Sequence, residues 1–259
     1  MQSTPVSVGS TEMDCLRRVR EVCPETNLPG YWANLSDNCS QWARHVGADK
    51  FWTEAKTRLS QWRTEYQAAT GAALLRASDF PEFVGKSEAS IRDKLFRQWK
   101  KDPEVINQMA SASPSLPPIK DLVRTRVVCT FIDGVEFLTS KIAELAQEMN
   151  CLVDRNREGR LEGYFAQHLN IHHSVIYRLG GADRLASIVC EIQVASEMAT
   201  RMWDVGHALY ERIRGEATIP DNWQWDAHDP RFIPHQLGHM IHLADGLMVL
   251  IRESGKQEK

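Results

Sequence analysis

The sequence predicts an α+β fold, in which a small mixed β-sheet is flanked by helices and carries helical additions at its N- and C-terminal ends. Three observations lead to this prediction. Apolar residues recur at helical spacing on both sides of a central region, and that region contains three short runs rich in β-branched residues. Three prolines within residues 114–118 separate the first helices from the first long strand.

The N-terminal part is predicted to be helical. Residues 1–11 are polar and are expected to form a disordered tail, and residues 12–79 a helical region. One helix in this region presents an apolar stripe at steps of three and four residues, formed by Phe51, Ala55, Leu59, Trp62 and Tyr66. Another helix is predicted from Ser87 to Lys100, where Ser87 is suited to cap its first turn.

The core of the fold is expected to cover residues 80–215. Its predicted elements are a strand at 122–131, a helix at 135–149, strands near 169–177 and 187–193, and a helix at 196–213. The arginine-rich residues 155–160 are interpreted as a loop. Residues 216–259 should form a loop and a last helix near 233–252, whose apolar positions include Ile233, Leu237, Met240, Leu247 and Ile251.

Composition excludes several classes of protein. The net charge of −3, from 31 Lys and Arg against 34 Asp and Glu, is not that of an electropositive protein that coats nucleic acid. The six cysteines include no C-x-x-C pair, which favours reduced thiols and a cytoplasmic location over a zinc site. The sequence contains no run of 18 apolar residues, so no transmembrane helix and no membrane partner are expected. The N-terminus lacks the basic and apolar regions of a secretory signal.

Two carboxylates are candidates for metal chemistry. Asp121 lies at the mouth of the predicted strand, where it could ligate Mg²⁺, although a turn-forming Asp is the commoner case. Glu191 and Gln193 would share one exposed face of another strand, because Ile188, Cys190 and Ile192 would face the opposite way. The alternative for that pair is a solvated outer face of an edge strand.

Basic and aromatic residues form the other candidate segments. Lys86 lies at the start of a predicted helix, where free N–H groups favour anions, and a solvated basic face is the alternative. Tyr164 lies in a glycine-bearing loop that ends at His168 and could stack on a base, and an ordinary surface loop is the alternative. Asp204 and His207 are neighbours on a helix, where a lone His is more often structural than catalytic.

Taken together and in order, five segments resemble the RelA/SpoT synthetase domain family, which includes the small alarmone synthetases. The resemblance covers roughly residues 80–213. The segments that carry it are Lys86–Lys94 (KSEASIRDK), Asp121–Arg126 (DLVRTR), Gly163–His168 (GYFAQH), Glu191–Gln193 (EIQ) and Trp203–Tyr210 (WDVGHALY).

The resemblance implies a sheet of the nucleotidyltransferase-like type and a Mg²⁺-dependent pyrophosphokinase. Such an enzyme transfers the β,γ-diphosphate of ATP to the ribose 3′-hydroxyl of GDP or GTP and makes (p)ppGpp-type alarmones. Asp121 and Glu191 would hold the metal, and Glu191 would also draw the proton from the attacking hydroxyl. The residues implied to bind ATP and its phosphates are Lys86, Arg92, Lys94, Arg126 and His168, and those implied to bind the acceptor are Tyr164, Gln193 and His207.

Departures from the family pattern motivate two alternatives. Val84 replaces a usual Arg, Arg124 a small residue, and Thr200 an Asn that guanine-recognising members often carry. The first alternative is a toxin of a toxin–antitoxin pair, which would pyrophosphorylate the tRNA 3′ end or make adenosine alarmones and would have an antitoxin protein as partner. The second is a non-catalytic nucleotide-binding protein. The Trp-rich N-terminal helices and the last helix are suited to assembly, so a homo-oligomer is a further candidate partner.

Overall fold

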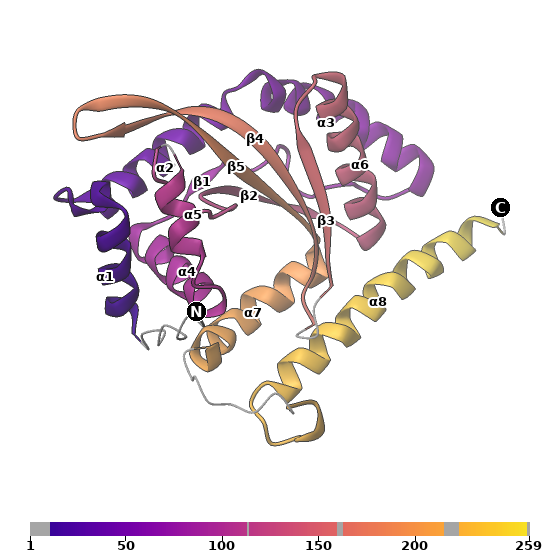
Figure 1. Cartoon of the computed structure of the whole chain (residues 1–259). Coiled ribbons are helices and arrows are strands. Elements are labelled where there is room, and N and C mark those ends of the chain that lie inside the picture. Colours follow the sequence, from indigo (N-terminus) through magenta and orange to yellow (C-terminus); the bar gives the residue numbers. More distant parts are fainter. Residues whose placement is uncertain (1–10, 113, 160–162, 215–222, 258–259) are drawn as a thin grey trace, which may run out of the picture. The chain divides into compact units, whose positions relative to one another are not determined.

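The computed structural model describes residues 11–112, 114–159, 163–214 and 223–257, without the side chains of 207–214, 223 and 257 (Figure 1). Its α-helices are α1 (Glu12–Val22), α2 (Tyr31–Gly47), α3 (Lys50–Thr70), α4 (Glu88–Lys101), α5 (Val105–Ser111), α6 (Ile132–Glu148), α7 (Glu197–Arg214) and α8 (Phe232–Gln257). Two short 3₁₀ helices are η1 (Pro24–Asn27) and η2 (Trp223–Trp225). The strands are β1 (Val84–Gly85), β2 (Val123–Cys129), β3 (Val153–Gly159), β4 (Phe165–Leu179) and β5 (Ala182–Ser196).

The predicted α+β class is confirmed. The five strands form one sheet in the order β1-β2-β5-β4-β3, with helices before, between and after them in the chain. A two-residue turn joins the long strands β4 and β5, and both of its residues, Gly180 and Gly181, have positive φ of 59° and 80°. This backbone favours glycine and matches the twist of a hairpin, which explains why the Gly-Gly pair stands there.

One predicted loop is wrong. A loop was predicted over residues 155–160 and 163–168, but Val153–Gly159 form β3, the edge strand beside β4, and β4 already begins at Phe165. Residue 160 lies outside the described residues. The guanidinium groups of Arg155 and Arg157 both pair with Glu136 of α6, at 2.7 and 3.0 Å. Pairing with β4 supplies the backbone hydrogen bonds of this strand, so its charged sequence, poor in β-formers, concealed it.

The chain forms two compact units, each built from three separate segments. The first comprises Met1–Asp49, Glu82–Thr125 and Ile171–Glu191, and the second Lys50–Pro81, Arg126–Asn170 and Ile192–Lys259. In the first unit α1 packs on α4 and α5, and α2 packs on β1 and α4. In the second unit α3 packs on α6, and α8 packs on both α6 and α7. The sequence boundaries at 79/80 and 215/216 stay predictions.

Side-chain hydrogen bonds attach α2 to strand β4 within the first unit. The indole Nε1 of Trp42 donates to the backbone carbonyl of Ile176 at 2.7 Å. The amide of Asn38, which is 2% exposed, donates to the carbonyl of Arg178 and accepts from its N–H, at 3.0 and 2.9 Å. A buried amide with paired donor and acceptor specifies the register of helix on strand, because a shift would leave both groups unsatisfied.

Gly85 is the point of closest approach between α2 and β1. A Cβ atom added there would lie 2.4 Å from the backbone carbon of Cys39 and 2.5 Å from its oxygen. Neither atom can move without shifting the helix, so only glycine fits this position. Gly85 directly precedes Lys86, and the backbone N–H of Lys86 donates to Leu122 O at 2.8 Å, so the same contact also positions Lys86.

We therefore expect Gly85→Ala to lower the free energy of unfolding by roughly 1–3 kcal/mol, as overpacking does elsewhere. The matched control is Gly246→Ala in α8, where an added Cβ meets nothing within 4 Å. That substitution should leave stability unchanged or raise it slightly, since alanine favours helix. Urea denaturation of both variants checks this, and equal midpoints would contradict the close-packing argument.

The last helix has the predicted position but not the predicted orientation. The expected apolar stripe is largely exposed: Ile233, Met240 and Ile251 are 69%, 65% and 73% accessible. The buried positions of α8 include Asp245, which is 1% exposed and accepts a hydrogen bond from Ile132 N at the start of α6. Helix α6 has no capping side chain of its own, so a carboxylate from α8 satisfies this free N–H instead.

None of the described helices has the length and apolar character that crossing a membrane requires. The six cysteines are free, and Cys129 and Cys190 are buried as their apolar surroundings predicted. Burial raises the pKa of both thiols. They behave as small core residues rather than as nucleophiles, because the reactive form of cysteine is the thiolate.

Candidate active site

A lysine–aspartate cluster lies in the first unit and consists of Lys86, Lys94 and Asp121. Lys86 follows β1, and Ser87 caps α4 as predicted by accepting a hydrogen bond from Ser90 N. Lys94 lies in the second turn of α4, and Asp121 precedes β2 by two residues. The antiparallel pairing of β1 with β2 brings the three together, although 27 and 35 residues separate the lysines from Asp121 in sequence.

Each carboxylate oxygen of Asp121 accepts a hydrogen bond from one lysine ammonium group. Lys86 Nζ lies 2.8 Å from Oδ2, and Lys94 Nζ lies 2.6 Å from Oδ1. The Asp121 side chain is 9% exposed, and burial alone would raise its pKa. The two lysines, Lys94 foremost, outweigh burial and lower the pKa of Asp121 to about 2. Asp121 is therefore ionised at neutral pH.

The cluster carries more positive than negative charge. Burial lowers the pKa of Lys86, and its pair with Asp121 opposes that effect. The Lys86 side chain is 10% exposed and that of Lys94 27%, so two cations share one anion in a partly dehydrated place. An anion with several oxygens, such as a phosphate chain, would complete this charge balance.

Glu191 and Gln193 lie on β5, the strand next to β2 in the sheet. The expectation that they would lie on an exposed face is wrong, because each is only 9% exposed. Strand β5 is central in the sheet and its last residues are buried on both faces. A carboxylate and an amide in such a strand cost folding free energy unless they have hydrogen-bond partners, so the burial of Glu191 and Gln193 calls for a reason beyond solubility.

Tyr164 and His168 meet in the second unit. The phenol oxygen of Tyr164 lies 3.2 Å from His168 Nε2, and the Tyr164 ring packs against Trp203 of α7 with centroids 4.9 Å apart. His168 is 7% exposed, whereas Tyr164 is half-buried. The arrangement holds the tyrosine ring in one orientation, which a residue that stacks on a base requires.

Gly238 was not anticipated as a positioning residue. The backbone of Gly163 has φ of +73°, and a Cβ added there would lie 2.5 Å from His235 O and 2.9 Å from Gly238 Cα in α8. Two glycines in direct backbone contact thus place the start of the Tyr164 segment against α8. A single glycine within a helix is a weak signal in sequence, and only the contact reveals its role.

Arg126 lies at the hydrogen-bonding limit from two side chains of the second unit. Its Nε is 3.4 Å from Gln193 Oε1, and its Nη1 is 3.4 Å from Asp204 Oδ1. Asp204 is 65% exposed, so this ion pair is weak and its arginine can exchange partners readily.

The remaining predicted residues lie elsewhere. Arg92 is not a member of the lysine–aspartate cluster, because its guanidinium pairs with Glu12 at 2.7 Å and with Glu88 at 3.4 Å. Binding of phosphate by Arg92 would require it to give up these partners. His207 belongs to α7, but its side chain lies outside the described residues.

Asp121 is suited to act as a ligand of Mg²⁺. Mg²⁺ binds hard, deprotonated oxygens and takes one or two carboxylates together with substrate phosphates, and the low pKa of Asp121 provides the ionised form. Among the described residues no group of three or more His, Cys, Asp or Glu could hold a metal ion. The donor set therefore fits an ion shared with a phosphate-bearing substrate better than an ion enclosed by protein ligands alone.

Neither a family model nor a curated protein matches this sequence. Solved structures do match. Small alarmone synthetase 1 from Bacillus subtilis, bound to its product pppGpp, matches with a TM-score of 0.54 and 17% identity over 87% of this chain and 98% of that one. This chain has the small alarmone synthetase fold. A GTP pyrophosphokinase family protein from Streptococcus pneumoniae also matches, with a TM-score of 0.50 and 17% identity over 86% of this chain and 96% of that one.

The small alarmone synthetase fold is the one that the sequence resemblance implied. A second structure of the Bacillus subtilis synthetase 1 matches with the same TM-score of 0.54 at 14% identity, over 88% of this chain and 99% of that one. The likeness therefore extends beyond residues 80–213, on which the sequence resemblance rests. At such identities the likeness concerns the course of the backbone, and residue roles have to be argued from this chain's own side chains.

Proposed function

We propose that the chain is an ATP-dependent pyrophosphotransferase that transfers the β,γ-diphosphate of ATP to the ribose 3′-hydroxyl of a guanine nucleotide. The observation that carries this proposal is the partly buried lysine–aspartate cluster, in which Lys86 and Lys94 both pair with the ionised Asp121. The fold, shared with enzymes described as small alarmone synthetases and GTP pyrophosphokinases, supports it.

The lysines supply the charge that diphosphate transfer needs. In the cluster their ammonium groups are held by Asp121, within 2.6–2.8 Å of its oxygens. When a triphosphate binds, the ammonium groups can turn from Asp121 to phosphate oxygens, where they neutralise charge on the moving group. Asp121 then has free oxygens for Mg²⁺. When bound, the metal polarises the phosphate oxygens and neutralises the charge of the leaving group.

Glu191 is the proposed general base. It accepts the proton of the acceptor 3′-hydroxyl as the oxygen attacks the β-phosphorus of ATP. The bond between that phosphorus and the oxygen bridging to the α-phosphorus breaks, and AMP leaves with this oxygen. Tyr164 would stack on the acceptor base, and Arg126 and His168 would contact phosphate oxygens.

The direct test uses the full chain with Mg²⁺ and ATP labelled at the γ-phosphate. We expect label to appear on GDP or GTP with release of equimolar AMP, and no transfer without Mg²⁺. Alkaline hydrolysis and chromatography of the product locate the label at the 3′ position. If neither guanine nucleotide is labelled while the protein remains folded, the proposal is wrong.

A toxin that modifies another acceptor is the second candidate. Thr200, which stands where guanine-recognising relatives often carry Asn, has a buried hydroxyl oxygen with no hydrogen-bond partner among the described residues. A buried hydroxyl without a partner is a candidate contact for a substrate. The same labelled ATP offered with deacylated tRNA, AMP or ADP separates the candidates: label on tRNA or on an adenine nucleotide favours the toxin. No label on any acceptor favours a non-catalytic nucleotide-binding protein.

A further inference from the structure

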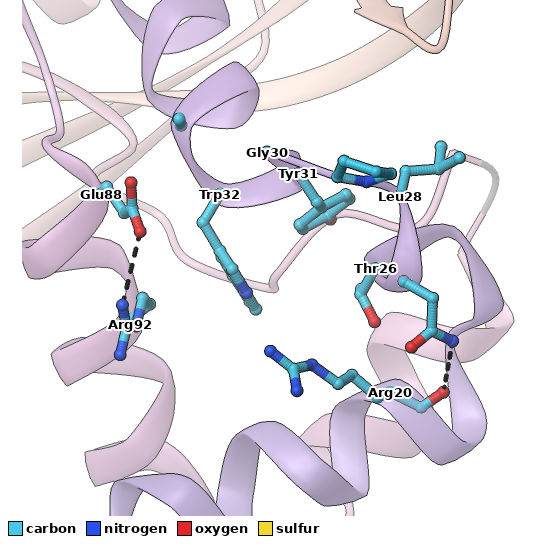
Figure 2. Close-up of a pocket in the computed structure, with 11 residues that line it drawn as sticks. Arg20, Thr26, Leu28, Gly30, Tyr31, Trp32, Glu88 and Arg92 are labelled. Atoms are coloured by element: carbon cyan, nitrogen blue, oxygen red, sulfur yellow. Dashed lines mark hydrogen bonds and ion pairs between the residues drawn. The ribbon is translucent and has the colours of Figure 1, made fainter.

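The first unit contains a pocket that has no role in the proposed transfer. We call it the N-terminal pocket. It has a volume of about 440 Å³ and lies between α1, η1, the start of α2 and α4 (Figure 2). This volume is in the range of small-molecule sites. None of Lys86, Lys94 and Asp121 lines it.

Arg20 supplies an uncompensated charge to this pocket. Its guanidinium makes no ion pair or hydrogen bond with the described residues, whereas its neighbours Arg17 and Arg18 pair with Asp14 and Glu21. Figure 2 shows the Arg20 guanidinium projecting into the open space toward Trp32. A planar cation with five donors that is left unpaired at the wall of a hollow favours an anion with several oxygens.

The opposite wall of the pocket contains a second arginine, whose charge is neutralised by carboxylates. Arg92 lines the pocket from α4, where Glu88 and Glu12 hold its guanidinium. Glu88 also lines the pocket, and its carboxylate is turned to Arg92 (Figure 2). Among the charged residues that line the pocket, Glu88 balances Arg92 and leaves the charge of Arg20, whereas Glu12, the other partner of Arg92, is not part of the lining.

Backbone groups add donors at the same place. Helix α2 begins after Gly30 without a capping side chain, and the N–H groups of Trp32 and Ala33 have no acceptor among the described residues. Gly30 and Trp32 both line the pocket. Free N–H groups at the start of a 17-residue helix attract the same kind of anion as the unpaired guanidinium does.

The rest of the lining suits a flat heterocycle. The Trp32 indole is 9% exposed and extends into the pocket (Figure 2), and Pro29 adds a second apolar ring to the lining. Asn27 donates one amide hydrogen to Arg20 O at 3.1 Å, which leaves its other hydrogen and its side-chain oxygen for a ligand. An aromatic plane beside a donor–acceptor pair and a cation is the set of groups that a nucleoside monophosphate requires.

We propose that the N-terminal pocket binds a purine mononucleotide, with the phosphate at Arg20 and the first turn of α2 and the base against Trp32. This site is separate from the lysine–aspartate cluster, so it can be occupied while transfer takes place. A ligand there contacts α1, α2 and α4, and Lys94 belongs to α4.

Amide hydrogen exchange of the full chain tests the proposal, with AMP, GMP or inorganic phosphate as the probe and without Mg²⁺. We expect AMP or GMP to slow exchange at residues 31–35. Arg20→Gln should weaken binding at least about tenfold, because a charge-assisted bond to phosphate is lost. The matched control Arg17→Gln, a surface position 71% exposed, should bind as the wild type does.

Two further measurements distinguish this site from the transfer site. Lys94→Gln should abolish diphosphate transfer but retain the AMP-dependent protection at 31–35, so failure of one proposal leaves the other measurable. Because Arg20 is exposed, Arg20→Gln should leave the fold intact, and an unchanged melting temperature verifies this. Unaltered AMP affinity in Arg20→Gln, or protection that excludes 31–35, overturns the proposal. Inorganic phosphate binding as tightly as AMP overturns the assignment of the base to Trp32.

Discussion

Glu191→Gln is expected to reduce diphosphate transfer by roughly a thousandfold or more, because the amide keeps the shape of the side chain but can neither accept the proton nor ligate Mg²⁺ as an anion. Glu191 is 9% exposed on a central strand, so an isosteric replacement is the least disruptive substitution available. The loss should appear in kcat under saturating ATP and acceptor, since the proton transfer occurs in the transition state.

The control for this variant lies on the same strand. Asp183→Asn also replaces a carboxylate by its amide in β5, but Asp183 is 56% exposed and pairs with Arg178 at the surface. It should retain the wild-type rate of transfer within about twofold, because a surface ion pair contributes little to the stability of the fold. A Glu191→Gln enzyme that works within about tenfold of the wild type contradicts both proposed roles of Glu191.

Asp121→Asn is expected to lower both stability and activity. The substitution leaves Lys86, whose side chain is 10% exposed, and Lys94 without their shared anion. The pKa of Asp121, lowered from 3.8 to about 2 in the folded chain, corresponds to about 2 kcal/mol of unfolding free energy at neutral pH. Transfer should also fall steeply, because Asn cannot ligate Mg²⁺ as an anion. Urea denaturation at pH 7 and the labelled-ATP assay measure the two losses.

The pH dependence identifies the cause of the stability loss. Because the folded pKa of Asp121 is the lower one, its contribution is fully present above the unfolded value of 3.8 and is lost as the pH falls toward about 2. The difference in stability between wild type and Asp121→Asn should therefore be constant from pH 7 to about 5 and should shrink between about 4 and 2. The control is Asp93→Asn, because Asp93 is 55% exposed and pairs with Arg97. Its stability should differ from that of the wild type by no more than about 0.5 kcal/mol at any pH. A difference between wild type and Asp121→Asn that does not depend on pH contradicts the ion-pair argument.

Local patterns predicted most of the elements. The helix over Lys50–Thr70 and the strand Val123–Cys129 match the predicted apolar stripe and β-branched run, because both report which face of an element is buried. The charged β3 and the two-residue β1 carry no such pattern, because their hydrogen-bond partners come from other strands. The exposed stripe of α8 shows the limit of periodicity: it marks an apolar face but does not say whether anything covers it.

The candidate site was predicted in part. Asp121, Lys86 and Lys94 were named from their segments, and the structure brings these three together through the pairing of β1 with β2. Arg92 lies in the same helix as Lys94, but α1 provides Glu12 as its partner, and no short-range pattern contains that contact. Gly238 likewise acts only through its contact with Gly163, 75 residues earlier in the chain.

The sequence by itself determined the α+β class, the order of the elements and which chemical groups the chain can offer, since propensity, periodicity and residue type are local properties. Only the tertiary structure decided which of those groups meet: two lysines on one aspartate and Arg92 on Glu12, while the Arg20 guanidinium at the N-terminal pocket has no partner among the described residues. The physical reason is that charge balance and burial depend on neighbours distant in sequence. Before the chain folds, an aspartate that will pair with two ammonium groups cannot be distinguished from one that will stay exposed to water.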